Sequence, residues 1–235
     1  MNNIGKTIGW ADLSWNPTKG VCPVGCWYCY AAKIYKRFKL DPEPWADIAE
    51  LNAVLDTRRT GKKIFVCSTF EIFHPITKTL TVRTPGKSIS IRDVIFDVIE
   101  RRPDLTFIIL TKLPQNIDRP MPKNVWLGVS AETHEEALGR YAILLGGQAG
   151  GNDGDVRFIS YEPMLEQPDL SHYIPDWLIV GRLTGHGKER DPKIWQLMSI
   201  REQCIYYNIP LFEKDNLRPI LGDKLVQQWP KEALR

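Results

Sequence analysis

The sequence lacks any apolar run approaching the roughly 20 residues needed to cross a bilayer, so a membrane-spanning helix is excluded. Its opening residues, MNNIGKTIGW, lack the apolar core of a secretory signal, and we therefore expect a cytoplasmic protein. The chain also has little excess charge, since 31 Lys and Arg against 28 Asp and Glu leave a net charge of +3. That balance is compatible with nucleic acid as a partner but does not demonstrate it.

Only five cysteines occur in 235 residues, and they are unevenly placed. Cys22, Cys26 and Cys29 lie within eight residues of one another, whereas Cys67 and Cys204 stand alone. An odd number of cysteines in a chain without an export signal argues against a disulfide framework. Clustered thiols in a cytosolic protein indicate metal or redox chemistry instead.

Short and nearly continuous apolar runs recur along the chain, as is typical of strands buried on both faces of a parallel sheet. They are residues 63–68, 105–111, 124–130, 156–162, 176–181 and 208–214. A seventh strand is expected near residues 8–15. The length suits a single domain over residues 1–235, with a cysteine loop at 16–30 and a C-terminal extension at 215–235.

Helical periodicity lies between these runs. It predicts helices over 45–55, 135–145 and 193–206, and a further helix that begins after Ser90 as its N-cap. Alternation of strands and helices indicates right-handed crossovers around a parallel sheet, and both an open barrel and a doubly wound sheet fit this pattern. The glycine-rich residues 146–155 follow a helix rather than a strand, so we interpret them as a surface loop and not as a dinucleotide-binding turn.

The spacing C-x3-C-x2-C at Cys22, Cys26 and Cys29 suits an iron–sulfur cluster. Three thiolates on one tight loop hold three irons of a cubane and leave the fourth iron open for a substrate or cofactor. The alternative is a structural zinc ion completed by Cys67 or a histidine. Zinc sites usually combine two C-x2-C pairs, or a Cys pair with a His pair, and neither combination is present.

The motif, with Tyr28 before its last cysteine and Tyr-Ala-Ala after that cysteine, resembles the radical S-adenosylmethionine (radical SAM) superfamily. Further segments resemble one small radical SAM family associated with phages and mobile elements, for which no reaction is agreed. These segments are 15–20 (WNPTKG), 107–114 (FIILTKLP), 124–132 (NVWLGVSAE) and 157–163 (RFISYEP). Together they extend the resemblance over residues 8–215.

The resemblance implies a partial (β/α)6 TIM-like barrel of parallel strands with the cysteine loop after the first strand. It implies a [4Fe-4S] cluster on Cys22, Cys26 and Cys29 that binds SAM at the open iron. Reductive cleavage of SAM then gives a 5′-deoxyadenosyl radical, which abstracts hydrogen from a substrate. A flavodoxin- or ferredoxin-type electron donor is the implied partner.

Further site residues are carried over from the resemblance by position. Tyr28 is expected beside the adenine of SAM, and Lys112 beside its carboxylate. Polar residues at the ends of the second to fourth strands are expected to receive the methionyl amine and the ribose diol. These strand-end residues are Ser68, Thr69, Glu71, Thr111, Ser130 and Glu132. Each of them also fits a simpler interpretation, a polar residue that caps the next helix.

Glu162 and Lys214 are the candidate catalytic residues, although Glu162 before Pro163 also fits a hydrogen-bonded turn. The chain departs from the family in two segments. Residues 181–185 read GRLTG where a GGESG-like loop is expected, and 213–216 read EKDN where relatives often have Lys-Gln-Trp. These departures leave the cofactor chemistry intact but indicate a different substrate.

Three hypotheses for the substrate and function remain open. Radical modification or repair of a nucleic acid base or nucleoside is favoured by mild basicity, by basic stretches at 33–39 and 58–63, and by a distant similarity to spore photoproduct lyase. The basic stretches also fit solvated surface. The second hypothesis is a radical enzyme acting on a small metabolite or peptide, and the third is a non-enzymatic, metal-stabilised module that binds nucleic acid.

Overall fold

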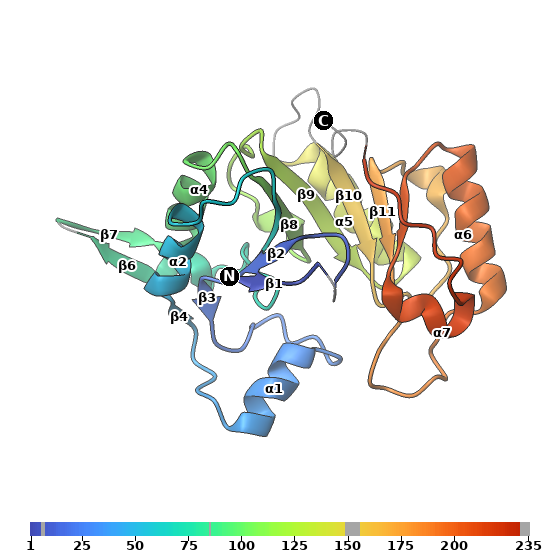
Figure 1. Ribbon diagram of the computed structural model, residues 1–235, viewed down its shortest axis with the longest axis horizontal. Coiled ribbons are helices and arrows are strands. Elements are labelled where there is room, and N and C mark those ends of the chain that lie inside the picture. The colour runs from blue at the N-terminus through green and yellow to red at the C-terminus, as the bar shows by residue number, and fades with distance from the viewer. Residues whose placement is uncertain (6–7, 85, 149–155, 231–235) are drawn as a thin grey trace.

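A computed structural model describes residues 1–5, 8–84, 86–148 and 156–230 of the chain (Figure 1). Its centre is an eight-stranded sheet in the order β1-β2-β5-β8-β9-β10-β11-β12. Apart from the antiparallel pair of β1 and β2, all neighbouring strands in this sheet are parallel. The expected α/β class with a mostly parallel sheet is therefore confirmed. The strands are β1 (Asn2–Asn3), β2 (Leu13–Trp15), β5 (Lys63–Val66), β8 (Thr106–Thr111), β9 (Val125–Ala131), β10 (Arg157–Tyr161), β11 (Trp177–Val180) and β12 (Leu211–Glu213).

Each of the six predicted apolar runs contains one of these strands, and β2 is the seventh. Two short antiparallel pairs were not predicted. They are β3 (Thr18–Lys19) with β4 (Trp45–Ala46), and β6 (Thr81–Thr84) with β7 (Lys87–Ser90). Neither pair carries an apolar run, because both lie outside the main sheet. Figure 1 shows the β6–β7 hairpin projecting from the body of the molecule.

The helices that cover the sheet follow the predicted periodicity closely. They are α2 (Ile48–Leu55), α4 (Ile91–Glu100), α5 (His134–Gly146) and α6 (Ile194–Tyr206). Ser90 caps α4 as predicted, since its hydroxyl accepts a hydrogen bond of 3.1 Å from the Asp93 amide. The predicted helix over 45–55 starts too early, because residues 45–46 pair with β3 and the Asp47 carboxylate caps the helix by accepting from the Glu50 amide.

The described residues hold three further helices: α1 (Tyr30–Phe38), α3 (Ile76–Thr79) and α7 (Arg218–Leu221). Short 3₁₀ turns lie at Pro114–Asn116, Leu170–His172 and Asp215–Leu217. No helix in the described part of the chain is long and apolar enough to cross a membrane. Of the predicted glycine-rich loop at 146–155, residues 149–155 lie outside the described residues.

The two faces of the sheet pack differently. The helix-covered face holds the large aliphatic core, to which α2, α4, α5 and α6 contribute. The opposite face packs a smaller, aromatic cluster that includes Trp10, Trp126, Phe158 and Trp177. These side chains are at least 93% buried. They therefore fill the second face of the sheet, beside β9, β10 and β11. Space for a ligand is therefore to be sought at the strand ends.

Candidate functional site

The cysteine loop leaves β2 and crosses the carboxyl edge of the parallel strands before it enters α1. Two turns shape it: the Gly25 amide donates to the Cys22 carbonyl at 3.3 Å, and the Cys29 amide donates to the Cys26 carbonyl at 3.0 Å. Gly25 has a φ of +68°, which glycine adopts at little cost. Cys29 is the N-cap of α1, and its sulfur accepts from the Ala32 amide at 3.5 Å.

The three thiols of this loop are free, partly buried and lined up along one cavity of about 170 Å³. The strands β5, β8 and β9 contribute the other walls through the residues that end or follow them. The cavity therefore brings together nine of the predicted site residues: Cys22, Cys26, Cys29, Ser68, Thr69, Glu71, Thr111, Lys112 and Ser130. Parallel α/β folds place binding sites at this edge of the sheet.

The thiols lie close enough to influence one another electrostatically. Burial raises the pKa of Cys22 to about 11, and the neighbouring charges of Glu71 and Cys26 add to this rise. Burial also raises the pKa of Cys26, although the Lys112 ammonium opposes the change. A bound cation therefore has to displace protons from the loop. Within the described ranges, no three Cys, His, Asp or Glu side chains converge on one point as a single metal ion requires.

Cys67 is placed differently from the expectation that it lies inside a strand. It follows β5 with a φ of +52°, is buried, and lines the same cavity as the cysteine loop. Burial raises the pKa of its thiol to about 12. Cys204, by contrast, is buried in α6, inside the helix predicted over 193–206.

Glu71 is buried and its carboxylate is saturated by neighbouring donors. One oxygen accepts from the Thr111 hydroxyl at 2.7 Å and the Phe73 amide at 3.0 Å, and the other accepts from the Lys112 amide at 2.8 Å. Burial nevertheless raises the pKa of Glu71 above its ordinary value. These contacts tie the loop after β5 to the loop after β8 and so shape the cavity wall.

Lys112, Glu132 and Tyr28 meet in one cluster. The Lys112 ammonium donates to the Tyr28 hydroxyl at 2.6 Å and pairs with the Glu132 carboxylate, to which the Tyr28 hydroxyl also donates. Burial alone raises the pKa of Glu132, but hydrogen bonds and the Lys112 charge outweigh it and lower this pKa to about 2. Three predicted SAM contacts thus bind one another and fasten the cysteine loop to the ends of β8 and β9.

We expect Lys112→Met to raise the pKa of Glu132 and to destabilise the protein by about 2 kcal/mol at neutral pH, because the buried carboxylate loses the nearer of its two cations and keeps only Arg140 at 3.5 Å. The depressed pKa stabilises the fold above the ordinary value of 4.5, and this stabilisation is lost as the pH falls toward 2. The difference between the two proteins should therefore shrink below about pH 4.5. Carbon-13 NMR of the glutamate carboxyls and urea unfolding at several pH values measure both effects. Lys112→Arg is the control, and an unchanged Glu132 titration in Lys112→Met would contradict the assignment.

Asn16 is a site residue for which the sequence analysis proposed no role. Its side-chain oxygen accepts from the Ser68 hydroxyl at 3.0 Å and from the Thr69 amide at 3.3 Å. This contact holds the start of the cysteine loop against the residues that follow β5. The only sequence signal was its place in the WNPTKG segment that carried the resemblance.

Glu162 and Lys214 form a second cluster on the same edge, at the ends of β10 and β12, and neither lines the cysteine cavity. The Lys214 ammonium lies 2.6 Å and 2.7 Å from the two carboxylate oxygens of Glu162. The Asn216 amide donates to Glu162 at 3.2 Å and to the Arg182 carbonyl at 3.1 Å. A Cβ at Gly181 would lie 2.7 Å from the Glu162 carboxylate, so a larger residue there would push the ends of the Glu162 and Lys214 side chains aside.

The loop after β11 reaches back to the cysteine loop. The Arg190 guanidinium lies 4.7 Å from the Trp27 ring centroid, and the His186 ring lies 5.0 Å from it. The Lys33 ammonium is 2.5 Å from the Nε2 atom of His186. The loop after β11 therefore contacts the cysteine loop and α1 through residues 186 and 190, just beyond the segment 181–185.

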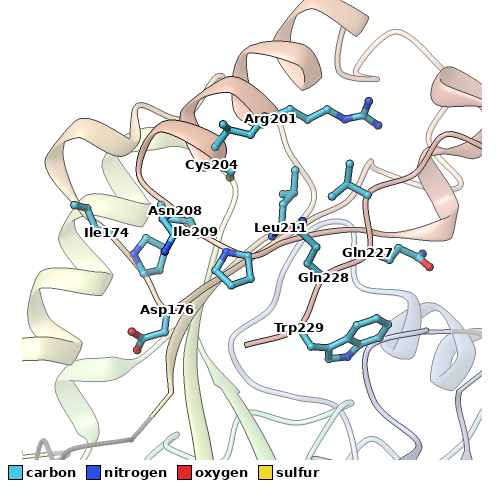
Figure 2. A pocket seen from close by; sticks show the side chains of 14 residues that line it. Ile174, Asp176, Arg201, Cys204, Asn208, Ile209, Leu211, Gln227, Gln228 and Trp229 are labelled. Carbon is cyan, nitrogen blue, oxygen red and sulfur yellow. Dashed lines mark hydrogen bonds between the residues drawn. The ribbon is translucent and has the colours of Figure 1, made fainter. Parts of the chain in front are cut away.

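A second and larger cavity, of about 900 Å³, lies at the amino edge of the sheet (Figure 2). It is bounded by the end of α6, by residues just before β11 and β12, and by Trp229 of the C-terminal segment. Arg201 on its rim is already paired with Glu213 at 2.7 Å. None of the predicted site residues lines this cavity.

Comparison with protein families gives one result. A family model described as "Protein of unknown function (DUF5131)" matches residues 5–218. The chain belongs to the DUF5131 family. No curated protein and no solved structure gives a significant match. The DUF5131 match contains the whole cysteine cavity together with Glu162 and Lys214, so both clusters belong to the part of the chain that defines the family.

Proposed function

We propose that this DUF5131 protein is a radical SAM enzyme acting on a nucleic acid base or nucleoside. One observation carries the proposal: the three free thiols of the C-x3-C-x2-C loop line one cavity with the polar ends of β5, β8 and β9. As part of this proposal, the parallel strands form a partial (β/α)6 barrel of the TIM type. The cytoplasm, where thiols stay reduced, suits such a protein.

The donor set of the loop fits a [4Fe-4S] cluster. In a cubane each thiolate binds a different iron, so the three sulfurs need not converge on a single point. Cys22, Cys26 and Cys29 would hold the cluster, whose open iron and bound SAM supply a 5′-deoxyadenosyl radical when an electron donor of the flavodoxin or ferredoxin type reduces it. The backbone turns at Gly25 and Cys29 keep the three side chains on the cavity side of the loop.

The other cavity residues orient the cofactor and exclude water. Ser68 and Thr69 offer hydroxyls whose positions Asn16 holds, and Ser130 offers a third hydroxyl from β9. Lys112 is the cation that would pair with the SAM carboxylate. To do so, its ammonium would give up part of its contact with Glu132. Tyr28 of the cysteine loop does not line the cavity itself; its hydroxyl contacts this ion pair, and its ring would pack beside the adenine.

The Glu162–Lys214 pair is the candidate substrate-facing group. It lies on the same carboxyl edge as the cavity but outside it, and both side chains are partly exposed, at 24% for Glu162 and 16% for Lys214. A carboxylate and an ammonium 2.6 Å apart can hold a proton at either atom during a reaction at a base or sugar. The pair therefore supplies acid–base chemistry beside the site of radical formation.

Anaerobic reconstitution with iron and sulfide tests the proposal. We expect a brown protein with broad absorbance near about 400 nm, whose reduced paramagnetic resonance spectrum shifts when SAM is added. It should form 5′-deoxyadenosine, at a higher rate with the right nucleoside or oligonucleotide. A colourless protein that binds only zinc would identify a metal-stabilised module, and an intact cubane indifferent to SAM would identify an electron-transfer protein.

We expect Cys67→Ala to leave the iron content unchanged, although Cys67 lines the cluster cavity. The reason is that three thiolates suffice for a cubane with an open iron, while buried cysteines commonly behave as small apolar side chains. Iron and sulfide analysis of the reconstituted variant measures this. Loss of iron would mean that a fourth thiolate closes the cluster, and the SAM chemistry would then fail.

A further inference from the structure

The surface of α1, directly after the cysteine loop, combines basic and exposed apolar side chains. Residues 13–40 contain no Asp or Glu but five Lys or Arg. On α1 and the residue after it, basic side chains alternate with large exposed aromatic and aliphatic ones. We define the α1 surface as Tyr30, Lys33, Ile34, Lys36, Arg37, Phe38 and Lys39.

These side chains form two parallel rows. Tyr30, Ile34 and Phe38 follow one another at intervals of four residues, with exposed fractions of 59%, 43% and 62%. Lys33 and Arg37 form the neighbouring row, and the Arg37 guanidinium lies 5.4 Å from the Phe38 ring centroid. A soluble surface rarely exposes apolar side chains in such a continuous row without a partner.

The inner side of α1 is held in place, so the surface has a defined shape. Ala31 is buried, and the Tyr35 hydroxyl accepts from the Gly20 amide at 2.8 Å. Lys33 and Trp27 contact the loop after β11 through His186 and Arg190. In Figure 1, α1 stands away from the sheet on the side of its carboxyl edge.

The α1 surface is continuous with the candidate site. Tyr30 and Cys29 both line the cysteine cavity, while Tyr30 also begins the exposed row. The other basic stretch, with exposed Arg58, Arg59 and Lys62, precedes β5 and so lies at the opposite, amino edge of the sheet. Of the two basic stretches, only the one on α1 leads into the site.

We propose that the α1 surface binds single-stranded nucleic acid and guides it to the cysteine cavity. Lys and Arg neutralise phosphates, and exposed aromatic rings stack on unpaired bases irrespective of sequence. Charge complementarity selects a polyanion, because the surface offers no acidic side chain to a basic partner. This inference rests on the proposed function for its reaction. It deepens that function, because the substrate becomes a nucleic acid polymer rather than a free nucleoside.

Fluorescence anisotropy of the full-length protein with a labelled single-stranded oligonucleotide of about 12 nucleotides tests the inference. We expect binding whose affinity falls with salt. A K36Q/R37Q/K39Q variant should bind about 10- to 100-fold more weakly and lower the slope of log K against log salt by about 2, since each phosphate contact adds about 0.7 for single strands. Phe38→Ala should weaken binding about 5- to 100-fold without changing that slope.

A charge-matched control is available at the other edge of the sheet. R58Q/R59Q/K62Q removes the same number of positive charges and should bind almost like the wild type. If both triple variants lost oligonucleotide affinity equally, net charge alone would explain the binding, and the inference would be overturned. Binding to vesicles of anionic lipid without binding to oligonucleotide would also overturn it and would identify a membrane-surface helix.

The experiment separates this inference from the proposed function. Binding is measured with and without reconstituted iron, and 5′-deoxyadenosine formation is measured in the same preparations. Oligonucleotide binding without SAM cleavage would refute the proposed radical SAM activity but support nucleic acid binding by the α1 surface. SAM cleavage stimulated by free nucleosides, without binding of any oligonucleotide, would refute nucleic acid binding by the α1 surface but support the proposed radical SAM activity.

Discussion

We expect a Cys26→Ala protein to form no detectable 5′-deoxyadenosine in the anaerobic assay, because two thiolates would bind the proposed cluster poorly and misplace its open iron. Cys26 is the middle cysteine of the loop: it follows the turn closed by Gly25 and Cys22, and its carbonyl accepts from the Cys29 amide in the next turn. The rest of the fold should persist, since the parallel sheet is built from strands between residues 13 and 213 that do not use this thiol. The loop itself should lose order, because metal ligation is coupled to local folding.

Iron content, far-ultraviolet circular dichroism and limited proteolysis of the variant measure these effects. Cys204→Ala is the matched control, since Cys204 lies buried in α6 and has no part in the site. It should keep its iron and its SAM cleavage with a modest loss of stability. SAM cleavage at the wild-type rate in Cys26→Ala would refute the proposed cluster.

Glu162→Gln should separate cofactor chemistry from substrate chemistry. The change keeps the shape of the side chain but removes the charge that faces the Lys214 ammonium at 2.6 Å and 2.7 Å. Loss of a positioned acid or base typically lowers a rate 10²- to 10⁴-fold. We therefore expect substrate turnover to fall by about 10²-fold or more, while uncoupled formation of 5′-deoxyadenosine continues because the cysteine cavity is untouched.

The two products are measured in the same reaction by liquid chromatography. Lys214→Arg keeps the ion pair and should retain part of the turnover, whereas Lys214→Met should resemble Glu162→Gln. The double variant Glu162→Gln/Lys214→Met should be no worse than either single change if the pair acts as a unit. Equal loss of both products in Glu162→Gln would instead assign Glu162 to the fold of the cavity or to SAM binding.

The sheet was predictable from sequence because its strands are buried on both faces. A strand such as β9, whose residues are all buried, has to be a continuous apolar run, and no helix of a soluble protein needs that pattern over so few residues. The pairs β3–β4 and β6–β7 carry no such pattern, since they are short and largely exposed. For β6–β7 the sequence does offer one signal, the Pro85-Gly86 dipeptide between two polar stretches.

The site was predictable in position but not in its internal contacts. Strand-end polar residues in a parallel sheet share one edge, so Ser68, Thr111 and Ser130 had to lie close together. The pairing of Lys112 with Glu132 and Tyr28 depends on where a loop 84 positions away returns, and no local pattern records that. The same holds for Asn16, whose partners lie 52 and 53 positions further along the chain.

Segments near the two ends of the chain cover the two edges of the sheet. β1 pairs with β2 at one edge, and at the other edge the Glu213 amide donates to Val226 while the Gln228 amide donates to Leu211. An uncovered edge of buried strands is a template for another molecule, and open sheets that leave one exposed tend to associate edge to edge. Shortening the protein to its parallel strands would thus expose both edges of the sheet and favour aggregation. Truncated versions used for crystallisation or display should keep both flanking segments.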